Sequence, residues 1–132
     1  MGRITYLEYS NRDLKAAEVM LEAGLHDHAG RLSQQVVEKR FKHYIELRGD
    51  LSDMRIFATH NLGKLYRRIC QLADVPLEKE VKGDLAELTD YYFDTNYPQE
   101  HGNIELTEEM AESAVVVAKE MAVWVDELLE RL

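Results

Sequence analysis

The chain of 132 residues contains a single cysteine, Cys70, and only two prolines. One cysteine excludes an internal disulfide framework and a zinc site built from several thiolates. Cys70 follows Leu65, Tyr66 and Ile69 at helical spacing, so we expect a buried thiol rather than a reactive nucleophile. The cysteine is therefore assigned to the core.

Long apolar runs are also missing. No stretch approaches the ~20 apolar residues that a membrane-spanning helix requires, and no positively charged leader precedes an apolar segment. The length is that of one domain, long enough to bury a core and too short for two independent ones. These features predict a single domain over residues 1–132, cytoplasmic and without a membrane partner.

Positive charge is scarce, since 16 Lys and Arg face 25 Asp and Glu, for a formal net charge of −9. This excludes a surface that binds nucleic acid all over, because phosphate contacts need clustered Lys and Arg. Residues 31–68 nevertheless hold nine basic and four acidic side chains, a net charge of +5, so the remainder carries −14. The asymmetry permits a local anion-binding face, but the two halves can equally pair across the fold. Binding of nucleic acid is left open.

The few glycines and prolines leave long stretches in which apolar residues recur every three or four positions. This period is typical of helices that face a core, and few segments alternate as a strand would. Gly24 is expected to end the first helix, and Thr59 and Thr107 to cap the third and the last. Residues 50–58 are expected to form a polar, flexible connection and 94–103 an irregular loop. The predicted helices cover residues 6–23, 27–48, 59–72, 77–93 and the stretch from 107 onwards.

The last predicted helix has an unusually wide apolar face. Met121, Trp124 and Leu128 follow a four-three heptad rhythm, and a parallel row of alanines and a valine widens the stripe. A stripe this broad can pack against its own bundle and against a second protein. We therefore predict a homodimer with Met121, Trp124 and Leu128 at its interface, and deep burial within a monomer is the alternative.

Three stretches of sequence occur in an order and at a spacing that cover nearly the whole chain. They are Asp13-Leu14-Lys15-Ala16-Ala17 followed by Gln34-Gln35-Val36-Val37-Glu38-Lys39, then Thr59-His60-Asn61-Leu62 with Leu65, and finally Tyr91-Tyr92-Phe93-Asp94-Thr95-Asn96-Tyr97-Pro98. Together they resemble the HEPN family, the higher eukaryotes and prokaryotes nucleotide-binding domain. The family's counterparts are a first helix followed by QQ-x-x-EK, a T-H-x-L-x-x-L opening of the third helix, and Y-x-x-x-R-Y-P before the last helix.

The resemblance implies an all-α, up-down bundle of four main helices plus a shorter one. Members of the family commonly form dimers, and bacterial members are often paired with a minimal nucleotidyltransferase in a toxin–antitoxin-like pair. Other members are ribonucleases with an R-x(4–6)-H motif. In this chain Asn96 stands where that motif has arginine, and His101 follows with the motif's spacing.

This departure bears on catalysis. Metal-independent RNA cleavage needs a base and a cation that stabilises the pentavalent phosphate. Asn96 supplies no positive charge, and a lone loop histidine is more often only solvated. We therefore predict no catalytic residue, with Asn96 and His101 as the only candidates. The alternative is a divergent metal-independent ribonuclease that uses His101 with an arginine borrowed from elsewhere in the chain.

Gln34, Gln35 and Lys39 lie within two turns of the second predicted helix, where they can present amide and ammonium groups to a nucleotide phosphate. They can equally line a seam between helices. His60 comes directly after the expected cap of the third helix, where a structural role is the simpler interpretation. The sequence contains no pair of Glu-x-x-His motifs, P-loop, dinucleotide-binding glycines or zinc-ligand spacing, so neither a metal nor a cofactor is expected.

The sequence thus predicts a non-catalytic HEPN protein. It would act as a dimeric module that binds a nucleotide or a protein, with a minimal nucleotidyltransferase as one candidate partner. The family resemblance carries this step, because fold by itself does not determine function.

Overall fold

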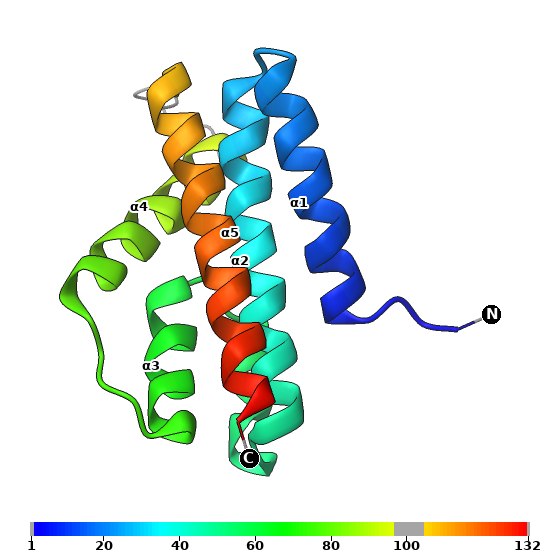
Figure 1. Cartoon of the computed structure of the whole chain (residues 1–132), viewed down its shortest axis with the longest axis vertical. Coiled ribbons are helices and arrows are strands. Elements are labelled where there is room, and N and C mark those ends of the chain that lie inside the picture. The colour runs from blue at the N-terminus through cyan, green and yellow to red at the C-terminus, as the bar shows by residue number, and fades with distance from the viewer. Residues whose placement is uncertain (1, 97–104, 132) are drawn as a thin grey trace.

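A computed structural model describes residues 2–96 and 105–131, and for residues 94–96 it describes the backbone alone. Within these ranges the regular structure is entirely helical, and Figure 1 shows the helices gathered around α2. The all-α bundle expected from the sequence is confirmed. The elements are α1 (Tyr6–Glu22), α2 (His26–Arg48), the 3-10 helix η1 (Leu51–Ala58), α3 (Leu62–Ala73), α4 (Lys79–Asn96) and α5 (Glu108–Glu130).

The first two helices form an antiparallel hairpin. Thr5 caps α1, because its hydroxyl accepts the Glu8 N–H while the Glu8 carboxylate accepts the Thr5 N–H. Gly24 follows α1 with a φ of 79°, a left-handed conformation that glycine adopts without strain. The predicted start and end of this helix therefore agree with the structure to within one residue.

Helix α2 is the centre of the bundle and is in contact with α1, α3, α4 and α5. A helix surrounded in this way buries more than one stripe, so even charged residues of α2 lie inside. Gly30 lets Leu106 pack directly against the α2 backbone, since a Cβ at this position would lie only 2.8 Å from Cδ2 of Leu106. The buried polar and charged residues of α2 are Ser33, Gln34, Glu38, Arg40 and Lys42.

Residues 50–58 depart from the sequence-based prediction. They form η1 rather than a flexible connection, because the Asp50 carboxylate accepts the Ser52 N–H while the Asp53 carboxylate accepts the Asp50 N–H. Arg68 of α3 then binds the buried Asp53 carboxylate through Nε at 2.6 Å and Nη2 at 3.1 Å. The acidic pair is thus used to start a helical turn and to hold it against α3.

The predicted cap of the third helix was also wrong. Thr59 ends η1, and its hydroxyl accepts the N–H of Asn61, which holds the chain extended for two residues. Asn61 is the residue that caps α3, through its side-chain oxygen and the Lys64 N–H at 3.2 Å. His60 therefore lies before the helix and not in its first turn.

Helix α4 begins at Lys79 and reaches Asn96, three residues beyond its predicted end. Pro98 restricts only the residue directly before it, so Asp94 to Asn96 can continue the helix despite their low helix propensity. The side chain of Asn96 and all of His101 lie outside the described residues. The structure therefore does not test their predicted role.

Helix α5 buries its broad apolar face inside its own bundle. Met121 and Leu128 are 8% and 4% exposed, and the indole of Trp124 packs edge-on against Phe41 at 6.1 Å and at a tilt against Tyr66 at 5.4 Å. Packing within the protomer therefore explains the width of the stripe. The homodimer stays a prediction, but of the three residues that suggested its interface Met121 and Leu128 are buried in the core and Trp124 is partly buried against Phe41 and Tyr66.

Two smaller expectations can be compared with the structure. Cys70 is 4% exposed, and burial raises the pKa of its thiol, in line with the structural role expected for it. Among the described residues, no helix is both long enough and apolar enough to span a bilayer.

Candidate functional site

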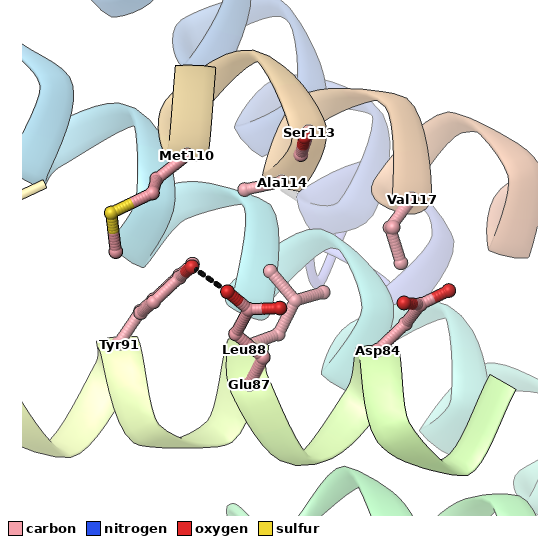
Figure 2. A pocket seen from close by; sticks show the side chains of 8 residues that line it. All are labelled: Asp84, Glu87, Leu88, Tyr91, Met110, Ser113, Ala114 and Val117. Atoms are coloured by element: carbon pink, nitrogen blue, oxygen red, sulfur yellow. Dashed lines mark hydrogen bonds between the residues drawn. The ribbon is translucent and has the colours of Figure 1, made fainter. Parts of the chain in front are cut away.

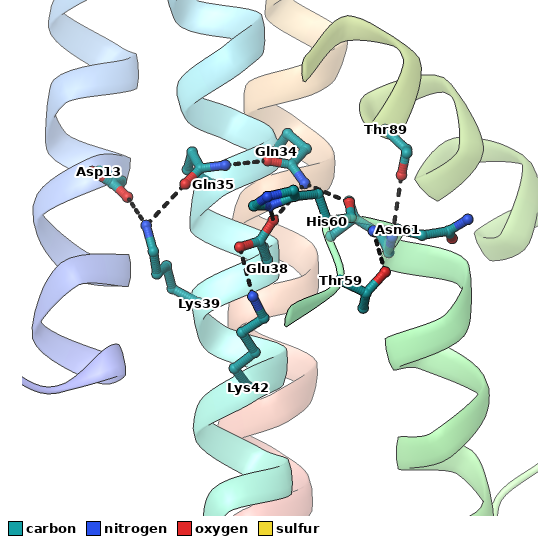
Figure 3. Close-up of polar contacts among 11 residues, drawn as sticks. Asp13, Gln34, Gln35, Glu38, Lys39, Lys42, Thr59, His60, Asn61 and Thr89 are labelled. Carbon is teal, nitrogen blue, oxygen red and sulfur yellow. Dashed lines mark hydrogen bonds and ion pairs between the residues drawn. The ribbon is translucent and has the colours of Figure 1, made fainter. Parts of the chain in front are cut away.

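A chain of hydrogen bonds runs along α2 from α1 to the start of α3 (Figure 3). Lys39 Nζ lies 3.5 Å from Asp13 Oδ2 and donates to Gln35 Oε1 at 2.9 Å. Gln35 Nε2 donates to Gln34 Oε1 at 2.6 Å, and Gln34 Nε2 in turn donates to Glu38. The structure therefore brings together the three residues that the sequence singled out, Gln34, Gln35 and Lys39.

The hydrogen-bonding groups of the Gln34 side chain are all occupied within the fold. Its side chain is fully buried, its amide nitrogen donates to Glu38 Oε1 at 3.1 Å and to the His60 carbonyl at 2.9 Å, and its oxygen accepts from Gln35. An amide nitrogen has two donor hydrogens, and both are occupied here. Gln34 thus joins α2 to the segment before α3, while a direct nucleotide contact by Gln35 or Lys39 stays a prediction.

Glu38 is the buried anion of this site. Its side chain is 3% exposed and lies 2.9 Å from Lys42 Nζ, whose own side chain is 5% exposed. Burial alone would raise the pKa of Glu38, but the hydrogen bonds from Lys42, Gln34 and His60 outweigh it and hold the pKa below its ordinary value. Glu38 is therefore a carboxylate that the fold keeps charged.

His60 is the member of the network that reaches the surface. Its Nδ1 lies 2.9 Å from Glu38 Oε1, and its side chain is 39% exposed. The imidazole also packs against Tyr92 at 4.8 Å with a tilt of 31° and against the edge of Phe93 at 6.4 Å. A carboxylate on Nδ1 favours the tautomer in which this nitrogen carries the proton, so Nε2 is left to accept a proton or a hydrogen bond.

The first turn of α3 begins two residues after His60 in the sequence. The Leu62 N–H donates to Thr89 Oγ1 at 3.2 Å and the Lys64 N–H to the Asn61 cap, whereas the Gly63 N–H has no hydrogen bond within the described residues. Lys64 itself is exposed. A free N–H, a positive helix end and an ammonium group together favour an anion. We call His60, Tyr92, Phe93 and this first turn the His60 surface.

The basic residues of 31–68 divide into two groups. Several are bound within the bundle: Lys39 pairs with Asp13 of α1 and Arg40 with Asp126 of α5, whereas Lys42 and Arg68 pair with acids of their own stretch, Glu38 and Asp53. Others have side chains without a hydrogen bond or ion pair among the described residues, namely Arg55, Lys64 and Arg67. Pairing across the fold thus accounts for part of the charge asymmetry, and a basic group on η1 and α3 remains.

A hollow between α4 and α5 is a poor alternative site (Figure 2). Its volume of about 40 Å³ leaves room for no more than a few waters. The Tyr91 hydroxyl donates to Glu87 there, and burial together with this carboxylate raises the pKa of Tyr91. Within the described part of the chain, no three His, Cys, Asp or Glu side chains are arranged to hold a metal ion.

Sequence reasoning missed the pair formed by Glu38 and His60. The two residues are 22 positions apart, and no local spacing connects them. His60 was expected directly after a helix cap, in a structural role, and Glu38 entered the resemblance only as part of the QQ-x-x-EK pattern. The available signal was that both belong to segments resembling one family, which suggests that their side chains have a shared task.

In the described part of the chain, six helices around one core, with a carboxylate–imidazole pair between α2 and the start of α3, define a small all-α domain of the HEPN type. The family model of the HEPN domain matches residues 5–128, and the chain belongs to this family. A search of curated proteins finds no match.

Two solved structures resemble the fold. ST0689, an archaeal HEPN homologue, is similar over 98% of this chain and 100% of its own, with 20% identity and a TM-score of 0.70. TT1696 from Thermus thermophilus is similar over 93% of this chain and 94% of its own, with 22% identity and a TM-score of 0.67. At these identities the likeness concerns the fold alone.

Proposed function

We propose that this HEPN protein is a non-catalytic, homodimeric module that binds a nucleotide at the His60 surface. The observation that carries the proposal is the half-exposed imidazole of His60, which a buried carboxylate holds through Nδ1 and an aromatic ring packs against. A side chain fixed on both sides and open to solvent is suited to contact a ligand. The predicted binding function is kept; His60 replaces the buried Gln34 as a contact residue, and Gln35 and Lys39 stay predicted contacts.

The chemistry of this surface matches the two parts of a nucleotide. A base can stack on Phe93, which is 42% exposed, or on the imidazole of His60, and such stacking contributes about 1–3 kcal/mol per base. A phosphate is attracted by Lys64 and by the positive end of α3, where the Gly63 N–H is available. Gln34 and Glu38 then act as positioning residues, because they hold the backbone and the ring of His60.

We expect no ribonuclease activity because Asn96 stands where the ribonuclease motif of the family has arginine. Cleavage at a phosphate needs a cation close to the developing charge, and asparagine has none. A minimal nucleotidyltransferase remains a candidate protein partner on the strength of the family resemblance. Copurification of the two proteins from cells that express both would support this pairing, and separate elution would count against it.

A divergent ribonuclease is the second candidate. The pair of Glu38 and His60 has the arrangement of a general base, in which a carboxylate orients an imidazole and leaves its other nitrogen free. In this case His60 or His101 would accept the proton of a 2′-hydroxyl group. Incubation with labelled RNA decides between the candidates, since RNA loss that His60→Ala or His101→Ala abolishes would favour the enzyme.

Calorimetric titration with ATP and with adenosine tests the binding proposal. We expect ATP to bind and His60→Ala to weaken it by about tenfold or more, each tenfold corresponding to ~1.4 kcal/mol. His28→Ala is the matched control, because His28 is an exposed histidine in the first turn of α2 and should bind as the parent does. Equal affinity of His60→Ala and the parent would contradict the site, and light scattering that shows a monomer would contradict the dimer.

A further inference from the structure

A second cavity lies on another side of the bundle, between the α3–α4 linker and α5. Asp74 ends α3 in the left-handed region with a φ of 54°, and the Val75 N–H donates back to the Cys70 carbonyl at 3.0 Å. The linker then leaves the bundle surface before α4 begins, as Figure 1 shows for the chain between α3 and α4. The space that remains has a volume of about 260 Å³ and is lined by Tyr66, Val75, Pro76, Glu78, Val81, Met121, Trp124 and Arg131.

The floor of this cavity is aromatic and rigid. The ring centroids of Tyr66 and Trp124 are 5.4 Å apart with a tilt of 54°. Trp124 also packs edge-on against Phe41 of the core, which restrains the indole. The Tyr66 hydroxyl accepts the Glu78 N–H at 3.0 Å, so the ring is held at its polar end by the linker. Trp124 is only half-buried, because part of the indole faces the cavity. Rings arranged in this way favour an apolar or aromatic group.

The edges of the cavity carry opposite charges. Glu78 and Arg131 are both exposed, and neither side chain has an ion-pair partner among the described residues. A carboxylate of a ligand fits Arg131, and an ammonium group fits Glu78. Because the whole chain carries a net charge of −9, a simple anion is repelled by the protein, whereas a zwitterion is not.

The volume of the cavity restricts the class of ligand further. Pockets that enclose drug-sized molecules measure about 300–1,000 Å³, and this cavity falls just below that range. We propose that the cavity binds a free amino acid with a large apolar or aromatic side chain. The side chain lies on Trp124 and Tyr66, the carboxylate meets Arg131 and the ammonium group meets Glu78. This site is separate from the His60 surface and does not depend on the nucleotide proposal.

The experiment uses Trp124, the single tryptophan of the sequence, as its own reporter. Intrinsic fluorescence, excited at the red edge where only tryptophan absorbs, is followed while L-phenylalanine is added. Phenylalaninamide, which lacks the carboxylate, and 3-phenylpropionate, which lacks the ammonium group, are titrated in parallel. We expect a saturable change with L-phenylalanine and affinities about tenfold lower for each of the two analogues.

Two variants, each lacking one charge, test which protein residue binds the carboxylate and which binds the ammonium group of the ligand. Arg131→Gln should abolish the preference for L-phenylalanine over its amide, and Glu78→Gln should abolish the preference over 3-phenylpropionate. Both side chains are exposed, so the fold should survive, and circular dichroism verifies this. Equal binding of the three compounds, preferences that persist in both variants, or no saturable change with L-phenylalanine would overturn the proposal.

Discussion

Two buried charges on α2, Arg40 and Glu38, are only two residues apart but face different neighbours. Arg40 is 4% exposed and donates to Ser10 at 3.1 Å, to Asn11 at 2.6 Å and to Asp126 at 2.9 Å. It thereby joins α2 to α1 and α5. Glu38 instead binds Lys42 within α2 and, outside α2, His60, whose ring is half-exposed.

The difference between the two clusters concerns where each one ends. All three nitrogens of Arg40 are bound within the bundle, so the cation itself is not available to a ligand, and its cluster reaches the surface at the Asp126 carboxylate, which is 53% exposed. The Glu38 cluster ends at the imidazole of His60, which is 39% exposed. Buried charges are costly unless they are paired, and in both clusters pairing offsets that cost. We infer that the Arg40 cluster serves architecture and that the Glu38 cluster serves the His60 surface as well.

The largest expected effect comes from removing the buried anion. Glu38→Ala leaves the ammonium group of Lys42, 5% exposed, without a counter-ion. Breaking a buried pair in this way costs about 3–5 kcal/mol, and we expect this loss in the free energy of unfolding. Urea denaturation measures it. The double variant Glu38→Ala with Lys42→Met should recover much of the stability, and a loss below about 1 kcal/mol in the single variant would show that water reaches Lys42.

Arg40→Ala should lower the free energy of unfolding by less than Glu38→Ala does, and this difference tests the contrast between the two clusters. Its partner Asp126 is 53% exposed and can be solvated when the guanidinium group is gone, so the cost is the packing of the arginine stem and the hydrogen bond to buried Ser10. We expect about 2 kcal/mol from these terms, again by urea denaturation.

Nucleotide titration of the same variant separates architecture from function. If the Arg40 cluster is purely architectural, folded Arg40→Ala should bind ATP as the parent does. A parallel loss of ATP affinity would show that the two clusters are coupled. Asp126→Asn is the matched control at the exposed end of the pair: it removes the counter-ion of buried Arg40 but keeps an oxygen that can accept from Nη1, so it should cost less stability than Glu38→Ala and leave ATP binding unchanged.

Much of the fold could be predicted from the sequence because its signals are local. Apolar spacing and Gly24 located α1, and Thr107 located the start of α5, since its side chain accepts the Met110 N–H. The helix η1 was not predicted: the reciprocal hydrogen bonds of Asp50 and Asp53 are local, but Asp53 is held against α3 by Arg68, fifteen residues away. Local rules for turns classify such a polar stretch as flexible, whereas a distant ion pair orders it.

The site was predictable only in part, for the same physical reason. The pattern around Gln34 and Lys39 pointed to the correct segment of α2, but spacing alone does not say which amide becomes fully buried. The structure places Gln34 inside because α2 is surrounded by four other helices. The exposed end of the network belongs to His60, on a segment that the sequence places at a helix start. Contacts between distant segments decide such roles, and they emerge only with the fold.

The smallest expected effect is the dependence of stability on acid. The pKa of Glu38 is lowered in the folded state, so the unfolded chain binds more protons than the native one between the two pKa values. The stabilisation is therefore fully present above the ordinary glutamate value of about 4.3 and is lost as pH falls through the lower, folded pKa. The sign follows from the direction of the shift, because a lowered carboxyl pKa means that the fold favours the charged form.

Glu38→Gln isolates this contribution, because it keeps the size and planar shape of the side chain and removes the group that titrates; the amide NH2 replaces one accepting oxygen, which lowers stability by an amount independent of pH. We expect the stability difference between the parent and Glu38→Gln to be constant just above the ordinary glutamate pKa and to shrink below it. Other carboxylates whose pKa is lowered, such as Asp53 beside Arg68, titrate equally in both proteins, so their contributions cancel in the stability difference. Arg40→Ala should keep the full acid dependence of the parent, since Glu38 is intact. A difference that stays constant down to strong acid would mean that the charge of Glu38 adds nothing to stability, and the contrast between the two clusters would then rest on geometry alone.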